Sequence, residues 1–337
     1  MQNDRVLASV CCITYNHAKY IRQALDSMLN QQLDGKYEVL VHDDASTDGT
    51  TDIVREYVKK YPGRVRAIFQ KENQYSRGRH DLSLLMGELF PRAQGEYIAV
   101  CEGDDFWSDN EKLQKQIDCL KKEVQCVACT CRTQVVRKDG IPLDQKLPSF
   151  NMDTGVIHSE DYIRRVFHEN RHLFHLSGLV FRTCEVIPVF GAQPEFMLQS
   201  EAGDRALFLY LATRGDIVFL NECLSCYRVM SEGSWSQKVA SSPEKAYLNN
   251  LSLIAMAEKF DQYTKGRYTE EIEEYKTFYR FYIAMYELDG REMKKDCYRR
   301  FYETLSVKQK IYFTLGSYFP WGGRLYRKIK KRVTERN

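Results

Sequence analysis

Along the first hundred residues, short apolar segments alternate with segments in which apolar residues recur every three or four positions. The short segments have the length and continuous hydrophobicity of strands buried on both faces. They predict strands at Val6–Thr14, Tyr37–His42, Val65–Phe69 and Tyr97–Cys101. The segments between these strands predict helices around Ile21–Leu29, Ile53–Val58 and Leu82–Leu89. Strands and helices that alternate in this way are typical of a mostly parallel sheet with helices on both faces.

The pattern is less regular after Asp105. The pattern predicts a helix at Lys112–Lys122, an extended segment at Cys126–Arg137 and a strand at His175–Arg182. It also predicts a helix from about Asp204 to Thr213 and two short strands at 217–220 and 224–229. Residues 142–155 contain turn-prone stretches and no clear period. From Pro243 onward the pattern is helical. We therefore expect an α/β unit with halves at 1–105 and 106–240, a helical appendage over 241–305 and a separate tail over 306–337.

The composition is that of a globular protein with a sizeable core. Of the 337 residues, 43% are hydrophobic and 28% are charged, which excludes a disordered or low-complexity chain. No apolar run approaches the roughly 20 residues that a membrane span needs, and the segment before Val6 lacks the features of a secretory leader. The eleven cysteines are scattered and mostly lie in apolar runs, as free buried thiols do. These features predict a cytoplasmic location.

Charge is distributed unevenly along the chain. Residues 308–337 hold nine Lys/Arg and one acid, which leaves 40 basic and 45 acidic side chains in the other 307 residues. The acidic body argues against a nucleic-acid partner. In the tail, apolar residues such as Ile311 and Trp321 accompany the basic cluster 327–332. This combination suits an anionic membrane surface, here the inner face of the cell membrane, although a solvated helix with a basic terminus explains it equally well.

Polar residues follow three of the predicted strands at the point where each ends. They are Thr14-Tyr15-Asn16, Asp43-Asp44-Ala45-Ser46 and Glu102-Gly103-Asp104-Asp105. Ligands of open parallel sheets bind at the carboxyl ends of the strands. Because carboxylates at one edge repel each other, their convergence indicates a cation or a ligand rich in hydrogen-bond donors.

The first of these turns has no glycine. Residues 14–18 cannot form a G-x-G-x-x-G loop, and no G-x-x-x-x-G-K-[ST] loop occurs anywhere in the chain. A phosphate-containing ligand at this edge therefore needs a counter-charge other than a loop of backbone amides. A Mg²⁺ or Mn²⁺ ion held by Asp104 would supply it, since both ions prefer oxygen ligands.

The order and spacing of these motifs resemble those of family-two glycosyltransferases of the GT-A fold. The resemblance rests on Ser9-Val10, Thr14 to Asn16, Asp43 to Thr50, the run Glu102 to Trp107 (an E-G-D-D-F-W form of the D-x-D motif), and Glu111-Lys112-Leu113. It covers roughly residues 5–237, is weak between 135 and 200, and does not extend beyond about residue 245. It implies a Rossmann-like, mostly parallel sheet flanked by helices, and a nucleotide-sugar donor.

The resemblance also implies roles for individual residues. The donor would contact Thr14, Tyr15, Asn16, Asp43, Asp44, Glu102, Gly103 and Asp105, with Asp104 on the metal ion. Asp204, an acid just before an apolar helix, would be the general base. Arg228 could provide positive charge to the leaving group, and Trp235 could stack on a sugar or belong to the core. The sequence departs from the family at Glu102, where Asp is usual, and at Met230, where His is frequent.

These roles predict an inverting transfer in which Asp204 takes the proton of an acceptor hydroxyl and the ion stabilises the departing nucleoside diphosphate. The family implies a UDP-sugar donor, a glycan or lipid-linked glycan acceptor, and a place in cell-surface polysaccharide or glycan synthesis. Two other interpretations stay open. Asp43, Asp44 and Asp204 could simply cap helices, and the two departures from the family leave room for a catalytically inactive, membrane-associated scaffold.

Overall fold

The computed structural model describes residues 5–78, 81–169, 173–199, 203–229 and 242–318 of the chain. The chain divides into two compact units, Met1–Lys238 and Val239–Asn337, which are described separately. Among the described residues, no helix combines the length and the hydrophobicity that crossing a membrane requires.

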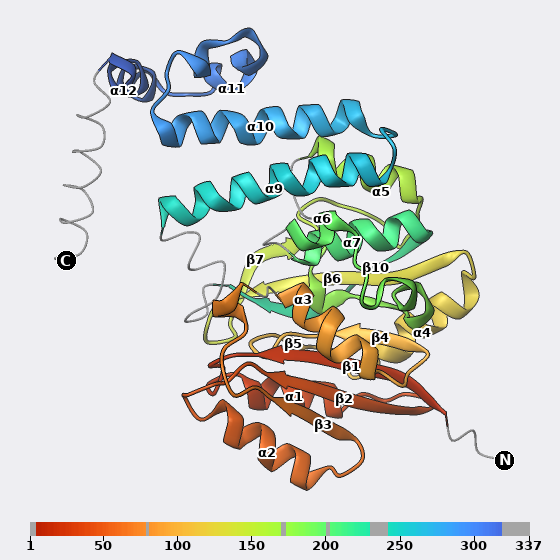
Figure 1. The fold of residues 1–337 in the computed structure, drawn as a ribbon. Coiled ribbons are helices and arrows are strands. Elements are labelled where there is room, and N and C mark those ends of the chain that lie inside the picture. The colour runs from red at the N-terminus through yellow and green to blue at the C-terminus, as the bar shows by residue number, and fades with distance from the viewer. Residues whose placement is uncertain (1–4, 79–80, 170–172, 200–202, 230–241, 319–337) are drawn as a thin grey trace. The chain divides into compact units, whose positions relative to one another are not determined.

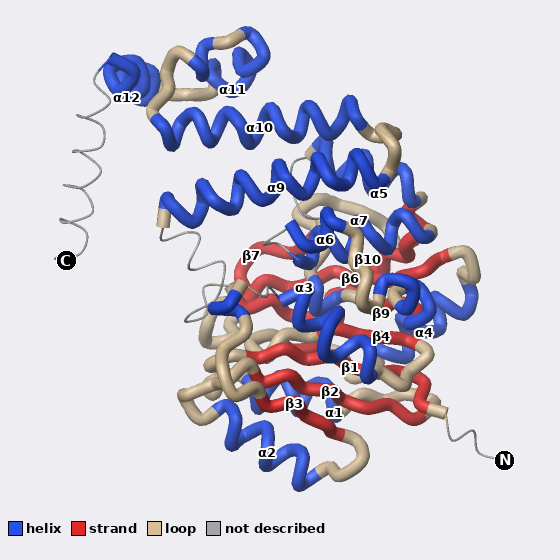
Figure 2. The backbone as a smooth tube through the Cα atoms, viewed as in Figure 1, coloured by secondary structure: helices blue, strands red, loops and turns tan. Residues whose placement is uncertain are grey.

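The first unit is built on a ten-stranded sheet. Its strands are β1 (Val6–Thr14), β2 (Lys36–Asp43), β3 (Val65–Phe69), β4 (Tyr97–Val100), β5 (Phe106–Trp107), β6 (Cys126–Val136), β7 (Pro142–Leu147), β8 (Gly155–Ile157), β9 (Val180–Arg182) and β10 (Asp216–Arg228). Their order is β3-β2-β1-β4-β9-β6-β10-β5, with β7 paired to β6 and β8 to β10. Figure 2 shows the strands side by side through this unit.

The amino-terminal half of the sheet, β3-β2-β1-β4, is wholly parallel. Helices α1 (Ile21–Leu29) and α2 (Thr50–Lys60) connect its first three strands, and a helical segment that begins with α3 (Asp81–Leu84) precedes β4. The apolar stripe of α1 is buried in one core with Ala8, Val10 and Cys12 of β1. The helix-flanked, mostly parallel sheet predicted from the apolar pattern is therefore confirmed (Figure 1).

The other half of the sheet mixes strand directions. β6 and β10 run parallel, while β9 lies antiparallel between β4 and β6, and β5 pairs antiparallel with β10. Helix α4 (Lys112–Lys122) leads into β6. Helices α6 (Glu195–Gln199) and α7 (Gly203–Arg214) precede β10, and α7 is buried on every side from Arg205 to Ala212. This burial explains why its sequence is apolar throughout rather than along one stripe.

Several elements lie outside the segments that the apolar pattern predicts: the short β5, β8 and α6, the strand β7 and one further helix. Residues 142–155 contain β7, whose side chains are largely exposed at the edge of the sheet and so show no apolar alternation. The further helix is α5 (Ser159–His168), whose buried residues Tyr162, Ile163, Val166 and Phe167 follow a helical spacing.

Two predicted strands have different bounds. In the segment predicted as a strand from His175, residues Leu176–Gly178 form a 3₁₀ turn and only Val180–Arg182 pairs in the sheet. The two short strands predicted after residue 216 are the single strand β10. Its pairing with β6 is irregular after Leu220, where two exposed polar residues interrupt the apolar run.

The second unit is helical. Helix α9 (Pro243–Tyr263) begins after Ser242, whose hydroxyl accepts a hydrogen bond from the Lys245 N–H at 3.3 Å. It packs against α10 (Thr269–Glu287), which is followed by the short α11 (Arg299–Glu303) and by α12 (Val307–Tyr318). A small core joins the end of α10 to α12 through Phe281, Ala284, Leu288, Met293, Tyr298 and Phe313.

Candidate functional site

The polar motifs meet at one edge of the sheet, called here the carboxyl edge. Strands β2, β1 and β4 are parallel neighbours, so their ends lie side by side. The backbone N–H of Asp44 donates to the carbonyl oxygen of Thr14 at 3.0 Å, and that of Gly103 donates to the carbonyl oxygen of Ile13 at 2.9 Å. The loops after β2 and β4 are therefore bonded to the end of β1.

Asp43 and Asp44 are buried and already bonded to their own chain. The Asp43 carboxylate accepts hydrogen bonds from the Ser46 hydroxyl at 2.5 Å and from the Thr51 hydroxyl. That of Asp44 accepts the backbone N–H groups of Gln74 at 2.7 Å and Tyr75 at 3.0 Å. Both carboxylates therefore shape the loops of the carboxyl edge, and their contact with a nucleoside stays a prediction.

The turn after β1 leaves one side chain at the surface. Asn16 has a φ of +54°, and its side-chain oxygen accepts the Thr47 N–H at 2.8 Å while its own N–H donates to the Ser46 hydroxyl at 2.9 Å. Tyr15 lies between Asn16 and Thr14, whose carbonyl oxygen accepts the Asp44 N–H, and its side chain is 39% exposed. An exposed aromatic ring beside a polar edge is suited to stacking on a planar ligand.

Gly103 lies so close to β1 that no side chain fits there. A Cβ atom on residue 103 would lie 2.5 Å from the Thr14 hydroxyl oxygen and 2.7 Å from its Cβ. The Thr14 hydroxyl oxygen is buried and has no hydrogen-bond partner among the described residues. The glycine of the E-G-D-D motif is thus needed for the close approach of the two loops.

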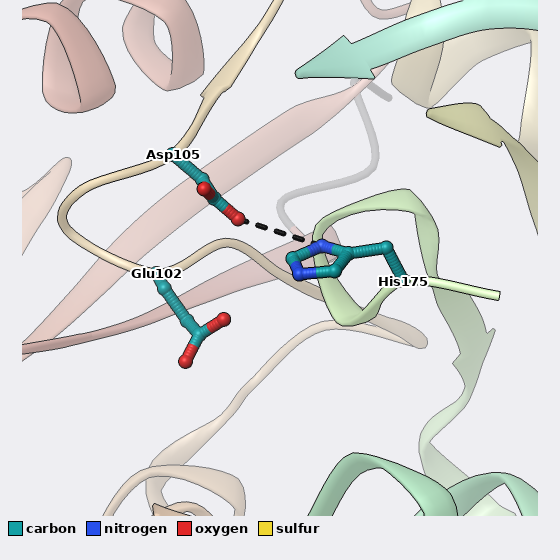
Figure 3. A group of neighbouring side chains, drawn as sticks. All are labelled: Glu102, Asp105 and His175. Atoms are coloured by element: carbon teal, nitrogen blue, oxygen red, sulfur yellow. Dashed lines mark ion pairs between the residues drawn. The ribbon is translucent and has the colours of Figure 1, made fainter. Parts of the chain in front are cut away.

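A compact group of titratable side chains lies beside this loop. One ligand-capable atom each of Glu102, Asp105 and His175 falls within 4.8 Å of the others (Figure 3). Asp104 carries a further carboxylate, and its Oδ2 is 3.8 Å from Nε2 of His17. The apolar pattern predicts only the start of a strand at His175. Its only sequence signal is an imidazole at the beginning of a buried segment.

Burial and mutual repulsion act on the acids of this group. Burial, followed by the negative charges of Asp105 and Asp104, raises the pKa of Glu102 well above its usual range. Burial and the charge of Asp104 also raise the pKa of Asp105. One oxygen of Asp105, Oδ2, is buried without a hydrogen-bond partner among the described residues. Such a group favours a bound cation or proton, because either relieves the repulsion.

Asp204 lies in the first turn of α7, and its charge contributes to the raised pKa of Glu102. The start of α7 packs against α3, since a Cβ on Gly203 would meet Cβ of Leu82 at 2.6 Å. The Asp204 carboxylate accepts the Arg205 N–H at 2.7 Å. The proposed base is therefore near enough to act electrostatically on the acidic group, and its catalytic role stays a prediction.

Arg228, at the end of β10, is buried and binds several groups of the same edge. Its guanidinium donates to the carbonyl oxygens of Asp104 and Lys138 at 2.8 and 2.9 Å, and to the side-chain oxygen of Gln23 at 2.8 Å. Its backbone N–H donates to Asp105 at 2.9 Å. These bonds hold the E-G-D-D loop in place at Asp104 and Asp105. Trp235 and Met230 lie outside the described residues.

The sequence matches a known family. The model of glycosyl transferase family 2 matches residues 9–182. A protein of unassigned function from Mycobacterium tuberculosis is 32% identical over 229 residues, which are 67% of this chain and 60% of that protein. TuaG of Bacillus subtilis, provisionally named a teichuronic acid biosynthesis glycosyltransferase, is 32% identical over 145 residues, 43% of this chain and 54% of TuaG. The chain thus spans about three fifths of the length of the first of these curated relatives.

Solved structures share the fold. Residues 1–349 of TarS from S. aureus, in complex with UDP-GlcNAc, give a TM-score of 0.55 at 18% identity over 91% of this chain and 78% of the TarS chain. The mannosyltransferase PcManGT from Pyrobaculum calidifontis, in complex with GDP-Man and Mn²⁺, gives 0.52 at 16% identity over 94% and 88%. These likenesses confirm the GT-A fold. Because the family match also covers more than half of the sequence, this chain belongs to glycosyl transferase family 2.

Proposed function

We propose that this protein is a metal-dependent, inverting glycosyltransferase that moves a sugar from a nucleotide-sugar to an acceptor hydroxyl. The observation that carries the proposal is the set of acids Glu102, Asp104 and Asp105 at the carboxyl edge, whose negative charges act on one another and of which one buried oxygen, Oδ2 of Asp105, has no hydrogen-bond partner among the described residues. Carboxylates gathered at such an edge suit a cation together with the phosphates that the cation binds.

The residues of this group fit a divalent ion. Glu102 and Asp104 would hold it, and their oxygen atoms are the ligands that Mg²⁺ and Mn²⁺ prefer. When bound, the ion would neutralise charge on the leaving nucleoside diphosphate. The raised pKa values of Glu102 and Asp105 support the fit, because the repulsion behind them falls when a cation binds.

Asp204 is our candidate for the general base. Its position in the first turn of α7 favours the ionised form, because the amino end of a helix attracts negative charge. A carboxylate that is ionised and close to the acidic group can accept the proton of an acceptor hydroxyl as the new bond forms. A single displacement of this kind inverts the anomeric centre.

The donor and the pathway follow from the relatives rather than from the geometry. The TarS complex contains UDP-GlcNAc and the PcManGT complex contains GDP-Man. We propose a UDP-sugar as donor, with Tyr15 next to the base and Asp43, Asp44 and Gly103 shaping its pocket. The name of TuaG supports a role in the synthesis of a cell-surface polysaccharide, with a glycan or a lipid-linked glycan as acceptor.

A lipid-linked acceptor would require contact with a membrane, and α12 offers a surface for it. Val307, Ile311 and Leu315 recur every fourth position along this helix and are 73%, 55% and 55% exposed. They therefore form an apolar stripe on one face of the helix. The segment 308–337, which begins in this helix, holds nine basic residues and one acid. We propose that stripe and tail together bind an anionic bilayer from the cytoplasmic side.

Hydrolysis of nucleotide-sugars by the purified protein tests the proposal. A panel of UDP- and GDP-sugars is incubated with Mn²⁺, with Mg²⁺ and with EDTA, and the released nucleoside diphosphate is measured. We expect release from one donor with either ion and none with EDTA or with Asp104→Asn. A protein that binds the donor but never turns it over would instead favour the scaffold interpretation.

A further inference from the structure

A lysine of α4 lies in the core without an acidic partner. Lys112 is fully buried, and within the described part of the chain it takes part in no ion pair. Burial lowers the pKa of its ammonium group. Burying such a group without a counter-ion is costly. The stability of the core alone therefore does not account for a lysine at this position.

The ammonium group of Lys112 is bonded to a glutamine one turn further along α4. Nζ donates to the side-chain oxygen of Gln116 at 2.6 Å and lies 4.3 Å from the centre of the Trp107 ring. The amide nitrogen of Gln116 donates to the carbonyl oxygens of Cys129 at 3.1 Å and Gly178 at 2.8 Å. Because an ammonium group only donates, it holds the amide oxygen on its own side and turns the amide nitrogen to these two carbonyls.

The bonds of this network lead to the turn Leu176–Gly178. The indole N–H of Trp107 donates to the carbonyl oxygen of Ser177 at 2.9 Å, next to the carbonyl of Gly178. A Cβ atom on residue 178 would lie 3.2 Å from the carbonyl oxygen of Cys131 in β6. The turn is therefore fixed at two consecutive carbonyl groups and packed against the sheet.

The same turn holds His175 against the acidic group. The backbone N–H of Ser177 donates to Nδ1 of His175 at 3.3 Å, and the Ser177 hydroxyl oxygen lies 2.8 Å from the same nitrogen. Nδ1 also lies 3.4 Å from Oδ2 of Asp105, and the ring stacks on Tyr227 with the ring centres 4.0 Å apart. Figure 3 shows the ring beside the carboxylates of Asp105 and Glu102. A shift of the turn would therefore move the imidazole relative to both acids.

We propose that Lys112 and Gln116 are positioning residues of the transfer reaction, because they fix the turn that sets His175 against the acidic group. This inference rests on the proposed function, since it assigns the network to the metal site. It gives the buried charge a role that core stability does not supply. A fully bonded polar network in a core favours one arrangement of the groups that it joins.

Lys112→Met tests the role of the charge, because it removes the donor to Gln116 and keeps a long side chain. Its urea midpoint should equal or exceed that of the wild type, since a buried charge is removed. The N–H groups of Gly178 and Leu179 donate within the turn at 3.0 Å. Their hydrogen exchange should become faster by about tenfold or more. Mn²⁺ affinity, measured by titration of the full chain, should fall by about tenfold or more.

Lys115→Met is the matched control. Lys115 lies on the same helix and pairs with Asp109 and Glu222, each at 2.9 Å. Its replacement removes one positive charge from α4 without touching the network. Hydrogen exchange in the turn and Mn²⁺ affinity should therefore stay at their wild-type values.

Gln116→Glu separates positioning from stability and keeps the test decisive if Lys112→Met fails to fold. It gives Lys112 an acidic partner and removes the N–H groups that bind the carbonyls of Gly178 and Cys129. If the network acts through the turn, exchange and Mn²⁺ affinity should change as in Lys112→Met, although the lysine is now paired. If Lys112 needs only a partner in the core, both quantities should keep their wild-type values.

The outcomes separate this inference from the function on which it rests. Wild-type exchange in the folded variants overturns the role of the network. Faster exchange with unchanged Mn²⁺ affinity also overturns it, because the turn then does not position the metal site. A wild-type protein that binds no Mn²⁺, with or without UDP, overturns the metal-dependent function instead, and exchange alone then decides whether the network fixes the turn.

Discussion

The guanidinium of Arg228 donates a 2.8 Å hydrogen bond to the backbone carbonyl of Asp104, a residue 124 positions earlier in the chain. The same buried side chain also binds the carbonyl oxygen of Lys138 and the side chain of Gln23. The loop that carries the acidic group is thus held by the last residue of β10. The position of the acids therefore depends on a strand that contributes no acid to this group.

Replacing Arg228 should therefore unfold the site. We expect Arg228→Met to lower the free energy of unfolding by about 3–5 kcal/mol, because each buried acceptor left without its donor costs about 1–3 kcal/mol. Urea denaturation measures the change. Arg137→Met is the matched control, since Arg137 forms an exposed pair with Asp139, and it should stay within about 0.5 kcal/mol of the wild type. Equal stability of the two variants would contradict the role of Arg228.

Gly103→Ala should disturb the loop without removing any functional group. The added methyl would lie 2.5 Å from the Thr14 hydroxyl oxygen, so either the loop or β1 must shift. We expect a stability loss of about 1–3 kcal/mol and at least tenfold weaker donor binding, measured by calorimetry. Gly155→Ala is the control, because nothing lies within 4 Å of a Cβ there. Unchanged donor affinity in Gly103→Ala would refute the need for close approach.

Asp204→Asn separates catalysis from binding. If Asp204 is the base, transfer should fall by about 10²–10⁴-fold, while donor and Mn²⁺ affinities stay within threefold of the wild type. Asp52→Asn provides the control, since Asp52 also lies in the first turn of a helix, α2, and is exposed. It should leave transfer unchanged. If Asp204→Asn loses donor affinity in proportion to activity, Asp204 acts in binding instead.

Removal of the metal should affect heat stability as well as activity. Mn²⁺ would relieve the repulsion that raises the pKa of Glu102 and Asp105, so the loaded protein should unfold at a higher temperature than the EDTA-treated one. The gain follows the ion concentration relative to its Kd, about 2.7 kcal/mol at a hundredfold excess. Differential scanning fluorimetry measures it, and Asp104→Asn should show a clearly smaller gain. An Mn²⁺-independent melting temperature in the wild type would argue against the site.

The exposed stripe of α12 can be tested apart from the basic tail. Replacing both Ile311 and Leu315 with Asp should abolish co-sedimentation with anionic vesicles, because burial of each side chain contributes about 1.5–3 kcal/mol. Removing 319–337 should weaken the binding to anionic vesicles by about 1 kcal/mol per basic residue removed. It should also make the binding depend less on salt concentration. Neutral vesicles are the control for the charge effect. Undiminished binding by both variants would exclude this surface.

The local sequence was sufficient for much of the first half of the fold. Continuous apolar runs such as Val6–Thr14 predicted the parallel strands, because strands covered on both faces have no polar side. The same reasoning placed Asp43, Asp44 and the Glu102–Asp105 run at one edge, since strand ends mark the edge whatever the side chains touch. It failed for β7, whose residues are exposed and show no apolar alternation. It also divided β10 into two short strands, because the apolar run is interrupted while the pairing with β6 continues.

The tertiary structure alone decided what the side chains of the edge do. Only packing reveals that Arg228 supports the acidic loop, or that His175 lies beside Asp105, 70 positions from it in the chain. A sequence pattern records which face of an element is buried. It does not record which distant groups share that burial, because hydrogen bonds and charge repulsion depend on distances that the chain acquires only when it folds.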